Sequence, residues 1–346
     1  FISNSAESRA GAIAAAYLTV NTSRFERNAC TADGCHGGAL SAGVSLDAQD
    51  NVFISNTARM GGGAVWGGVD YANVTGGLFQ ANTCTQAGCT GGGLWAPAPL
   101  TISQTDFIHN TSRGAGGGVY AGSTAALSGG QFTGNACLDG ACSGGGLYAA
   151  ASLDVSRAAF LGNSARGYGG AISHHAGAGS VVNSLFARNS ALSGGAALHL
   201  ASDGAVNIQH TTIASPTLGA GSAIEVITGT VQIFDTLVAS YSVGLRHLSA
   251  AGSVFEDYNL FYGVASQKVG PTTGGTNDLS GDPRFTNPAA DNYHLRLGSA
   301  AVDTGADIGV TLDFDADPRP QLGGFDIGYD EFVNEVFQLL LPLLRR

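Results

Sequence analysis

The chain has 346 residues, of which 12% are charged, and its 15 basic and 26 acidic residues give a net charge of −11. A soluble domain usually carries about 25% charged residues, and nucleic-acid binding requires a basic stripe that this acidic chain does not offer. No stretch approaches the ~20 apolar residues of a membrane span. We therefore expect a protein that neither binds nucleic acid nor spans a membrane.

The first feature along the chain is a repeat that begins at Phe1. Phenylalanine followed three residues later by asparagine recurs as FISN, FERN, FISN, FQAN, FIHN, FTGN, FLGN and FARN, at spacings of 24, 28, 26, 28, 25, 28 and 26 residues. Degenerate copies continue at Ile213, Val238 and Phe261, which makes about eleven repeats in all. A fixed period of this size indicates a repeat architecture.

Each repeat carries a second landmark, a run of small residues followed by an aliphatic residue, as in GGAL at 37, GGAV at 62 and GGGL at 91. Helical solenoids need about 33 or more residues per unit, whereas this chain has 53 glycines and short segments that alternate apolar and polar residues. The pattern predicts an all-β parallel solenoid of about eleven coils, with the glycines in turns of positive φ or against tight walls. We expect coils over 1–263, a capping section over 264–335 and an apolar tail over 336–346.

The asparagine of the first landmark holds the same place in eight successive coils. An amide side chain at such a place can satisfy both its own turn and the neighbouring coil. The sequence therefore predicts an asparagine ladder formed by Asn4, Asn28, Asn56, Asn82, Asn110, Asn135, Asn163 and Asn189.

All six cysteines lie in three alternate repeats, in pairs five positions apart that accompany a three-residue insertion. Local pairing with none left over predicts the disulfides Cys30–Cys35, Cys84–Cys89 and Cys137–Cys142, and hence an oxidising, extracellular compartment. The alternative is a zinc site, but pairs in alternate coils would lie about 9.6 Å apart, two strand spacings. Tetrahedral zinc needs four ligands around one point.

The FxxN and GGA phrases, over residues 1 to about 200, resemble the repeats of the polymorphic outer membrane proteins of chlamydiae and their wider bacterial relatives. The resemblance implies a right-handed β-helix of the pectin-lyase type, exported and often adhesive. The stretches GDPRFTNPAADNYHLRLGSAAVDTGA (281–306) and FDIGYDEF (325–332) resemble the C-terminal section of bacterial surface proteins with a choice-of-anchor Q domain. This chain has Ala300 where that family usually has proline.

Catalysis is the main alternative to a structural or adhesive role, because the pectin-lyase fold also hosts lyases and hydrolases, although fold does not give function. Glycoside hydrolysis needs converging carboxylates, and the acids of the repeats do not fall in equivalent places of adjacent coils. In ISHHAG (172–177), His174 and His175 should point to opposite faces of a strand. An ice-binding solenoid would need Thr-x-Thr rows, which the sequence does not contain. We therefore predict a non-catalytic surface-structural or adhesive protein, with a carbohydrate-active β-helix enzyme as the alternative.

Near the C-terminus, Asp313, Asp315 and Asp317 alternate along the chain. Carboxylates in this pattern can hold calcium through oxygen ligands, and they can equally be solvated or pair with Arg284 or Arg319. Calcium is the one cofactor that the sequence suggests.

The two ends of the chain suggest assembly. Phe1 already lies at a repeat landmark, and we expect a signal peptide to precede it. The tail VFQLLLPLLRR (336–346) is too short to span a bilayer and can pair with a neighbouring subunit as an added strand. Head-to-tail contacts of this kind predict a filament. A surface glycan or another cell-surface ligand is the other expected partner.

Overall fold

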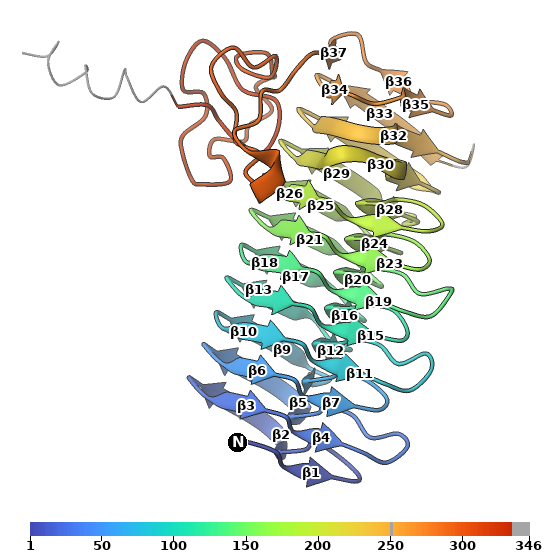
Figure 1. The fold of residues 1–346 in the computed structure, drawn as a ribbon, viewed down its shortest axis with the longest axis vertical. Helices are drawn as coiled ribbons and strands as arrows, with labels where there is room; N and C mark the ends of the chain where they lie inside the picture. Colours follow the sequence, from blue (N-terminus) through green and yellow to red (C-terminus); the bar gives the residue numbers. More distant parts are fainter. Residues whose placement is uncertain (250–251, 334–346) are drawn as a thin grey trace, which may run out of the picture.

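The structure, a computed structural model, describes residues 1–249 and 252–333. It is a solenoid of parallel strands that stack along one long axis (Figure 1). This all-β architecture of about ten turns confirms the predicted fold class. Within the described residues the only helix is the short 3₁₀ turn η1 (Pro288–Ala290), so none could cross a membrane.

The coils up to β27 have four strand positions, and the later coils lack the second. The first holds the strands of the phenylalanine landmark and its degenerate copies, which are β3 (Arg24–Glu26), β6 (Val52–Ile54), β10 (Leu78–Gln80), β14 (Asp106–Ile108), β18 (Gln131–Thr133), β22 (Ala159–Leu161), β26 (Leu185–Ala187), β30 (Thr212–Val226), β32 (Leu237–His247), β34 (Leu260–Tyr262) and β37 (Leu279–Ser280). The second holds a separate eight-stranded sheet that follows the asparagines, made of β1 (Ser5–Ala6), β4 (Ala29–Cys30), β7 (Thr57–Ala58), β11 (Thr83–Cys84), β15 (Thr111–Ser112), β19 (Ala136–Cys137), β23 (Ser164–Ala165) and β27 (Ser190–Ala191).

The third position follows the glycine runs. It holds β2 (Ile13–Asn21), β5 (Leu40–Gln49), β8 (Val65–Trp66), β12 (Leu94–Ala96), β16 (Val119–Ala121), β20 (Leu147–Ala149), β24 (Ile172–His174), β28 (Leu198–Leu200), the later parts of β30 and β32, and β35 (Ser266–Val269). The fourth holds the later parts of β2 and β5, then β9 (Tyr71–Thr75), β13 (Leu100–Ser103), β17 (Ala125–Ser128), β21 (Leu153–Ser156), β25 (Gly179–Val182), β29 (Ala205–Gln209), β31 (Gly229–Phe234), β33 (Gly252–Asp257) and β36 (Thr273–Gly274).

The core is a set of side-chain columns that run along the axis. The landmark phenylalanines from Phe25 to Phe186 are at most 1% exposed, and their rings stack with centroids 4.6–5.1 Å apart. Phe186 pairs in register with Ile213, which pairs with Val238 and then Phe261. The degenerate repeats are therefore true coils, and burial of each phenylalanine contributes roughly 1.5–3 kcal/mol relative to exposure.

The glycine runs meet two separate requirements. The first glycine of the run adopts a positive φ, as at Gly62 (59°) and Gly91 (68°), which places a turn before the third strand. The second glycine faces the next coil: a Cβ on Gly63 would lie 2.0 Å from the Gly92 carbonyl oxygen. Both explanations that the sequence suggested for the glycines therefore apply, at adjacent residues.

The coil strands extend to Ser280, because β35, β36 and β37 pair in parallel with β32, β33 and β34. This differs from the expected boundary at residue 263. Residues 281–333, which we call the C-terminal section, fold back along the side of the first-position strands β22 to β34 (Figure 1). They cover a lateral face, whereas we expected them to cover the end of the solenoid. The tail 336–346 lies outside the described residues.

Candidate functional site

The asparagine ladder links eight coils through side-chain amides that are buried from Asn28 onward. In each step the Oδ1 atom of one asparagine accepts the Nδ2 group and the backbone N–H of the asparagine in the preceding coil, at 2.8–3.0 Å. From Asn28 onward, Nδ2 also donates to the carbonyl of the phenylalanine in the preceding coil, as Asn110 does to Phe79 at 2.8 Å. The ladder is therefore structural, and its amides are not available to a ligand.

The three expected cysteine pairs lie at disulfide distance, with Cα atoms 5.4, 5.9 and 5.8 Å apart for Cys30–Cys35, Cys84–Cys89 and Cys137–Cys142. This supports an oxidising setting. We call residues 30–35, 84–89 and 137–142 the disulfide loops. They project from one side of the solenoid, opposite the C-terminal section (Figure 1). The second and third loops also touch, because the Gly88 N–H donates to Asp139 Oδ2 at 3.3 Å.

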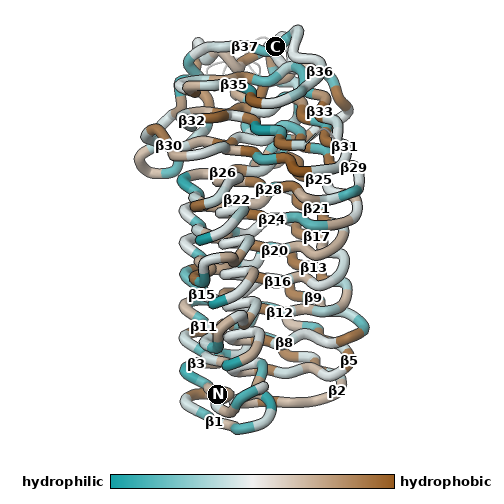
Figure 2. Tube along the Cα trace, turned by 90° about the vertical axis from the view of Figure 1, so that its right-hand side faces the viewer, coloured by the Kyte–Doolittle hydropathy of each residue, from teal (hydrophilic) through white to brown (hydrophobic). Residues whose placement is uncertain are grey.

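Beside these loops, outward-facing rings form a column on the third-position strands. Trp66, Trp95, Tyr120 and Tyr148 each follow a buried aliphatic residue, so strand alternation turns them outward. They pair in register from β8 to β20, and their ring centroids are 3.6, 6.0 and 5.0 Å apart. We call these four residues the aromatic column; its strands run up the middle of Figure 2.

Histidines continue the aromatic column at both ends. The His36 ring stacks on Trp66 at 4.1 Å, and the His175 ring lies 4.6 Å from Tyr148. As expected from strand alternation, His174 faces the other way: it is 1% exposed, and its Nε2 donates to the Ala176 carbonyl at 2.8 Å. His175 therefore belongs to the outer face and His174 to the interior.

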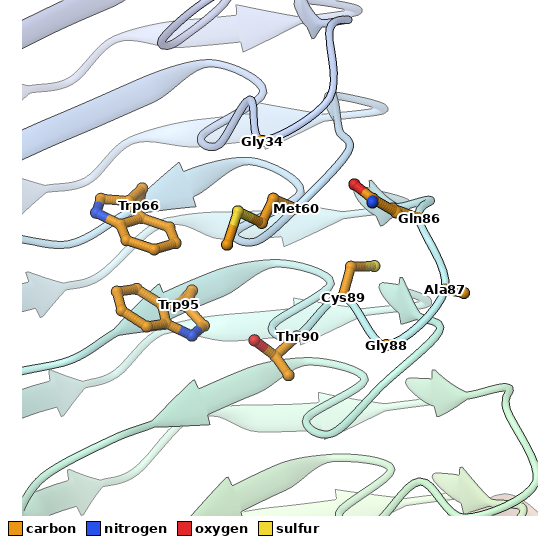
Figure 3. Close-up of a pocket in the computed structure, with 9 residues that line it drawn as sticks. All are labelled: Gly34, Met60, Trp66, Gln86, Ala87, Gly88, Cys89, Thr90 and Trp95. Atoms are coloured by element: carbon orange, nitrogen blue, oxygen red, sulfur yellow. The ribbon is translucent and has the colours of Figure 1, made fainter.

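Three hollows lie along the aromatic column, and the central one shares a lining residue with each of the other two, although Tyr120 lines none of them. The central one, of 420 Å³, lies between the tips of the first two disulfide loops, Met60 and the indoles of Trp66 and Trp95 (Figure 3). A second, of 420 Å³, shares Trp66 and reaches His36 and Arg9. A third, of 370 Å³, is lined by Tyr148 and His175 together with residues of the second and third loops, and it shares Gly88 with the central hollow. Together they form a groove, which we call the aromatic groove.

The floor of the aromatic groove is uncharged at neutral pH. Burial lowers the pKa of His36, with a further contribution from Arg9, and burial with His174 nearby lowers the pKa of His175. Burial raises the pKa of the Tyr148 hydroxyl. Among the residues that line the three hollows in the described part of the chain, the one carboxylate is Asp139, which pairs with Arg113 at 3.1 Å.

A polar cluster lies where the aromatic column ends. Ser173 Oγ is 2.9 Å from His175 Nε2 and 3.1 Å from His199 Nδ1. Burial lowers the pKa of His199 to about 4, with His175 adding to the effect. Ser173 is 0% exposed, so its hydroxyl orients the two imidazoles and cannot reach a substrate as a nucleophile. In the next coil Glu225 pairs in register with His199, and burial raises the pKa of its carboxyl.

The structure does not bring the three expected calcium ligands together. Asp313 is 0% exposed, and its carboxylate accepts the backbone N–H groups of Asp315, Asp317 and Glu331 at 2.8–2.9 Å. In the described residues, the metal-capable side chains that do converge are His294, Asp315 and Asp330. Calcium binding at the original triplet stays a prediction, although Asp313 already accepts three backbone amides.

The aromatic column was missed in the sequence because we searched the repeats for acids and histidines. Its signal is the residue directly after the second landmark, which reads GGAVW, GGGLW, GGGVY and GGGLY in four successive repeats. Comparison of the chain with known proteins found no matching protein-family model, curated protein or solved structure.

Proposed function

We propose that this chain is a non-catalytic extracellular β-helix protein that attaches to an extended, largely uncharged polysaccharide along the aromatic groove. The observation that carries the proposal is the aromatic column, which crosses four coils beside the disulfide loops. Exposed apolar surface rimmed by polar residues marks interaction sites. A groove that crosses successive coils suits a chain-like ligand better than a compact one.

The chemistry of the groove favours a sugar chain. Indole and phenol rings combine apolar surface with N–H or O–H groups, and sugars likewise combine C–H surfaces with hydroxyls. The aromatic floor carries no charge at neutral pH, and the charged lining residues are Arg9 at one end and the paired Arg113 and Asp139 at the other. An extended peptide is disfavoured, because strands β8, β12, β16 and β20 are paired on both sides and leave no edge for strand addition.

An exported, adhesive protein also agrees with the resemblance to polymorphic outer membrane protein repeats and with the oxidising setting that disulfides require. The expected filament rests on the chain ends and stays a prediction. The carbohydrate-active enzyme is the second candidate, favoured by the imidazoles of His175 and His199, which the buried Ser173 orients at the end of the groove. It lacks the converging carboxylates of glycoside hydrolysis in the groove lining that the structure describes.

The test is binding to a panel of polysaccharides, neutral and acidic, by the intact protein and by Trp95→Ala. We expect the variant to bind a neutral polysaccharide about thirtyfold more weakly, because truncating an aromatic hot spot costs about 2 kcal/mol. The matched control is Tyr262→Ala, which removes a 39% exposed ring on β34, outside the groove.

Equal loss in the two variants, or binding that Trp95→Ala leaves unchanged, would contradict the proposal. The same panel separates the two candidates if products are also measured. Release of shortened chains by the intact protein, abolished in His175→Ala, would establish the enzyme instead.

A further inference from the structure

The C-terminal section brings together three potential metal ligands outside the aromatic groove. One ligand atom each from His294, Asp315 and Asp330 lies within 4.8 Å of the other two. The three residues belong to separate loops of a section whose described residues contain no regular element except η1. A shared ion would therefore join loops that no strand ladder holds together.

Hydrogen bonding fixes the orientation of the histidine. Asn292 Oδ1 accepts the backbone N–H of His294 at 3.2 Å, which identifies this atom as the amide oxygen. The same oxygen lies 2.8 Å from His294 Nδ1, so Nδ1 carries a proton. The Tyr329 hydroxyl lies 3.3 Å from Nδ1 and can share that proton. In the neutral ring, Nε2 then presents a lone pair, and such a second partner on Nδ1 is the usual support of a metal-bound histidine.

That lone pair faces negative charge. Nε2 is 2.7 Å from Asp315 Oδ2 and 4.0 Å from Asp330 Oδ1. The Asp330 side chain is only 9% exposed, and its Oδ2 accepts the Leu295 N–H at 2.6 Å. Its Oδ1, the atom 4.0 Å from the same nitrogen, has no hydrogen-bond partner among the described residues. A lone pair beside two carboxylates is satisfied either by a proton shared between the nitrogen and a carboxylate or by a cation bound to all three groups.

We propose that His294 Nε2, Asp315 and Asp330 bind a divalent cation of the zinc type. Ligand atoms about 2.0–2.2 Å from a tetrahedral ion lie about 3.3–3.6 Å from one another. The observed 2.7 and 4.0 Å bracket this separation, so each contact needs to change by less than 1 Å. A nitrogen ligand disfavours calcium, which takes oxygen ligands.

The surroundings fit a small site that is open on one side. The Asp315 side chain is 46% exposed, which gives the ion an entry path and leaves the fourth position to water. The other two ligands flank buried anchors: His294 lies between Tyr293 and Leu295, and Asp330 follows Tyr329. These anchors pack against the side of β26, β30 and β32. The ion would therefore hold the C-terminal section against the coils.

The experiment uses the full chain with its disulfides intact and any free thiols blocked, stripped with EDTA and titrated with zinc chloride. We expect one equivalent to bind and the melting temperature to rise with zinc concentration, because an ion that binds only the folded state stabilises it. Cobalt in place of zinc should give the visible absorption of a tetrahedral nitrogen and oxygen site. Absence of stoichiometric binding would show that a proton fills the position and would overturn the proposal.

Variants locate the site. Asp315→Asn keeps the size of an exposed side chain and should melt like the parent without metal, yet bind zinc at least about tenfold more weakly. Asn292→Ala should weaken binding about 10–100-fold by freeing the imidazole. His109→Ala, an exposed histidine on another loop, is the control and should bind zinc normally. Unchanged affinity in Asp315→Asn would place the zinc elsewhere and refute the assignment.

Discussion

The coil stack and the C-terminal section satisfy their buried polar groups in opposite ways. In the coils, strand ladders pair the backbone, and uncharged asparagines such as Asn110 fill a buried turn that recurs from coil to coil. In the C-terminal section, carboxylates take that role: Asp326 accepts the N–H groups of Asp303 and Phe332, both at 2.7 Å. Buried N–H groups must find partners in either case. Where no strand ladder exists, charged side chains are the hydrogen-bond partners of the buried N–H groups.

This difference predicts that substitutions in the two regions will disturb the structure over different distances. A change in the coil stack should spread along a column, since the strands and asparagines of each coil complete the bonding of its neighbours. A change in the C-terminal section should stay local, because its contacts join particular residues. Four variants test this contrast.

The largest effect is expected for Asn110→Ala. The substitution removes the oxygen that accepts both the backbone N–H and the Nδ2 group of Asn82. We expect the free energy of unfolding to fall by about 2–6 kcal/mol, because each of two buried donors costs about 1–3 kcal/mol when left unpaired. Chemical denaturation measures this loss. Asn21→Ala, at an exposed asparagine on β2, is the control, and a similar small loss in both variants would refute a structural ladder.

In the C-terminal section, Arg319→Met should have a comparable but local effect. The guanidinium pairs with Glu331 at 2.9 Å and donates to the carbonyls of Asp326 and Gly328. Removing one partner of a buried ion pair costs about 3–5 kcal/mol. Hydrogen exchange should show faster opening of residues 281–333 while the coils before β22 keep their protection. Uniform loss of protection along the chain would contradict the contrast.

Loss of one disulfide should have a smaller effect. Replacing Cys84 and Cys89 by alanine should lower the free energy of unfolding by about 2 kcal/mol, the chain-entropy value for so short a loop. Peptide mapping without reduction should find three links in the parent and two in the variant. Free thiols in the parent, or links between different pairs, would be inconsistent with the predicted pairing.

The smallest expected effect is the pH dependence of stability that arises from His210. This residue is 0% exposed and lies where the C-terminal section meets the coils. Burial, with Arg319 nearby, lowers its pKa to about 3, and its Nδ1 lies 3.2 Å from the Asp326 carbonyl. A depressed histidine pKa means that the unfolded chain takes up the proton first. Stability from neutral His210 is therefore complete above pH 6.5 and is lost as pH falls toward 3.

His210→Gln removes this titration while keeping a donor for the carbonyl. Relative to the variant, the parent should lose about 2 kcal/mol between pH 7 and pH 5, since one pKa unit corresponds to about 1.4 kcal/mol. Melting curves of both proteins across that range measure the difference. Parallel curves would mean that the pKa of His210 is the same in the folded and the unfolded chain, and would contradict the prediction.

The sequence revealed the coil stack because residues with the same packing and hydrogen-bonding roles recur in successive coils. One phenylalanine, one asparagine and one glycine pair recur at a common period, so each position is observed many times. The aromatic column repeats as well, and it was overlooked only because attention went to ionisable groups. The C-terminal section has no period: His210 meets the carbonyl of Asp326 across 116 residues. Nor could spacing show that Asp313 would bind backbone amides while Asp315 turns to His294.

Intrinsic tryptophan fluorescence tests the central claim most directly, because the chain has two tryptophans and both line the central hollow of the aromatic groove. We predict that a polysaccharide bound by the protein changes the emission in a saturable way. It should also protect Trp66 and Trp95 from acrylamide quenching at the concentration that half-saturates binding. A polysaccharide that binds with neither a change in emission nor protection from the quencher would show that the ligand lies elsewhere and would contradict the account.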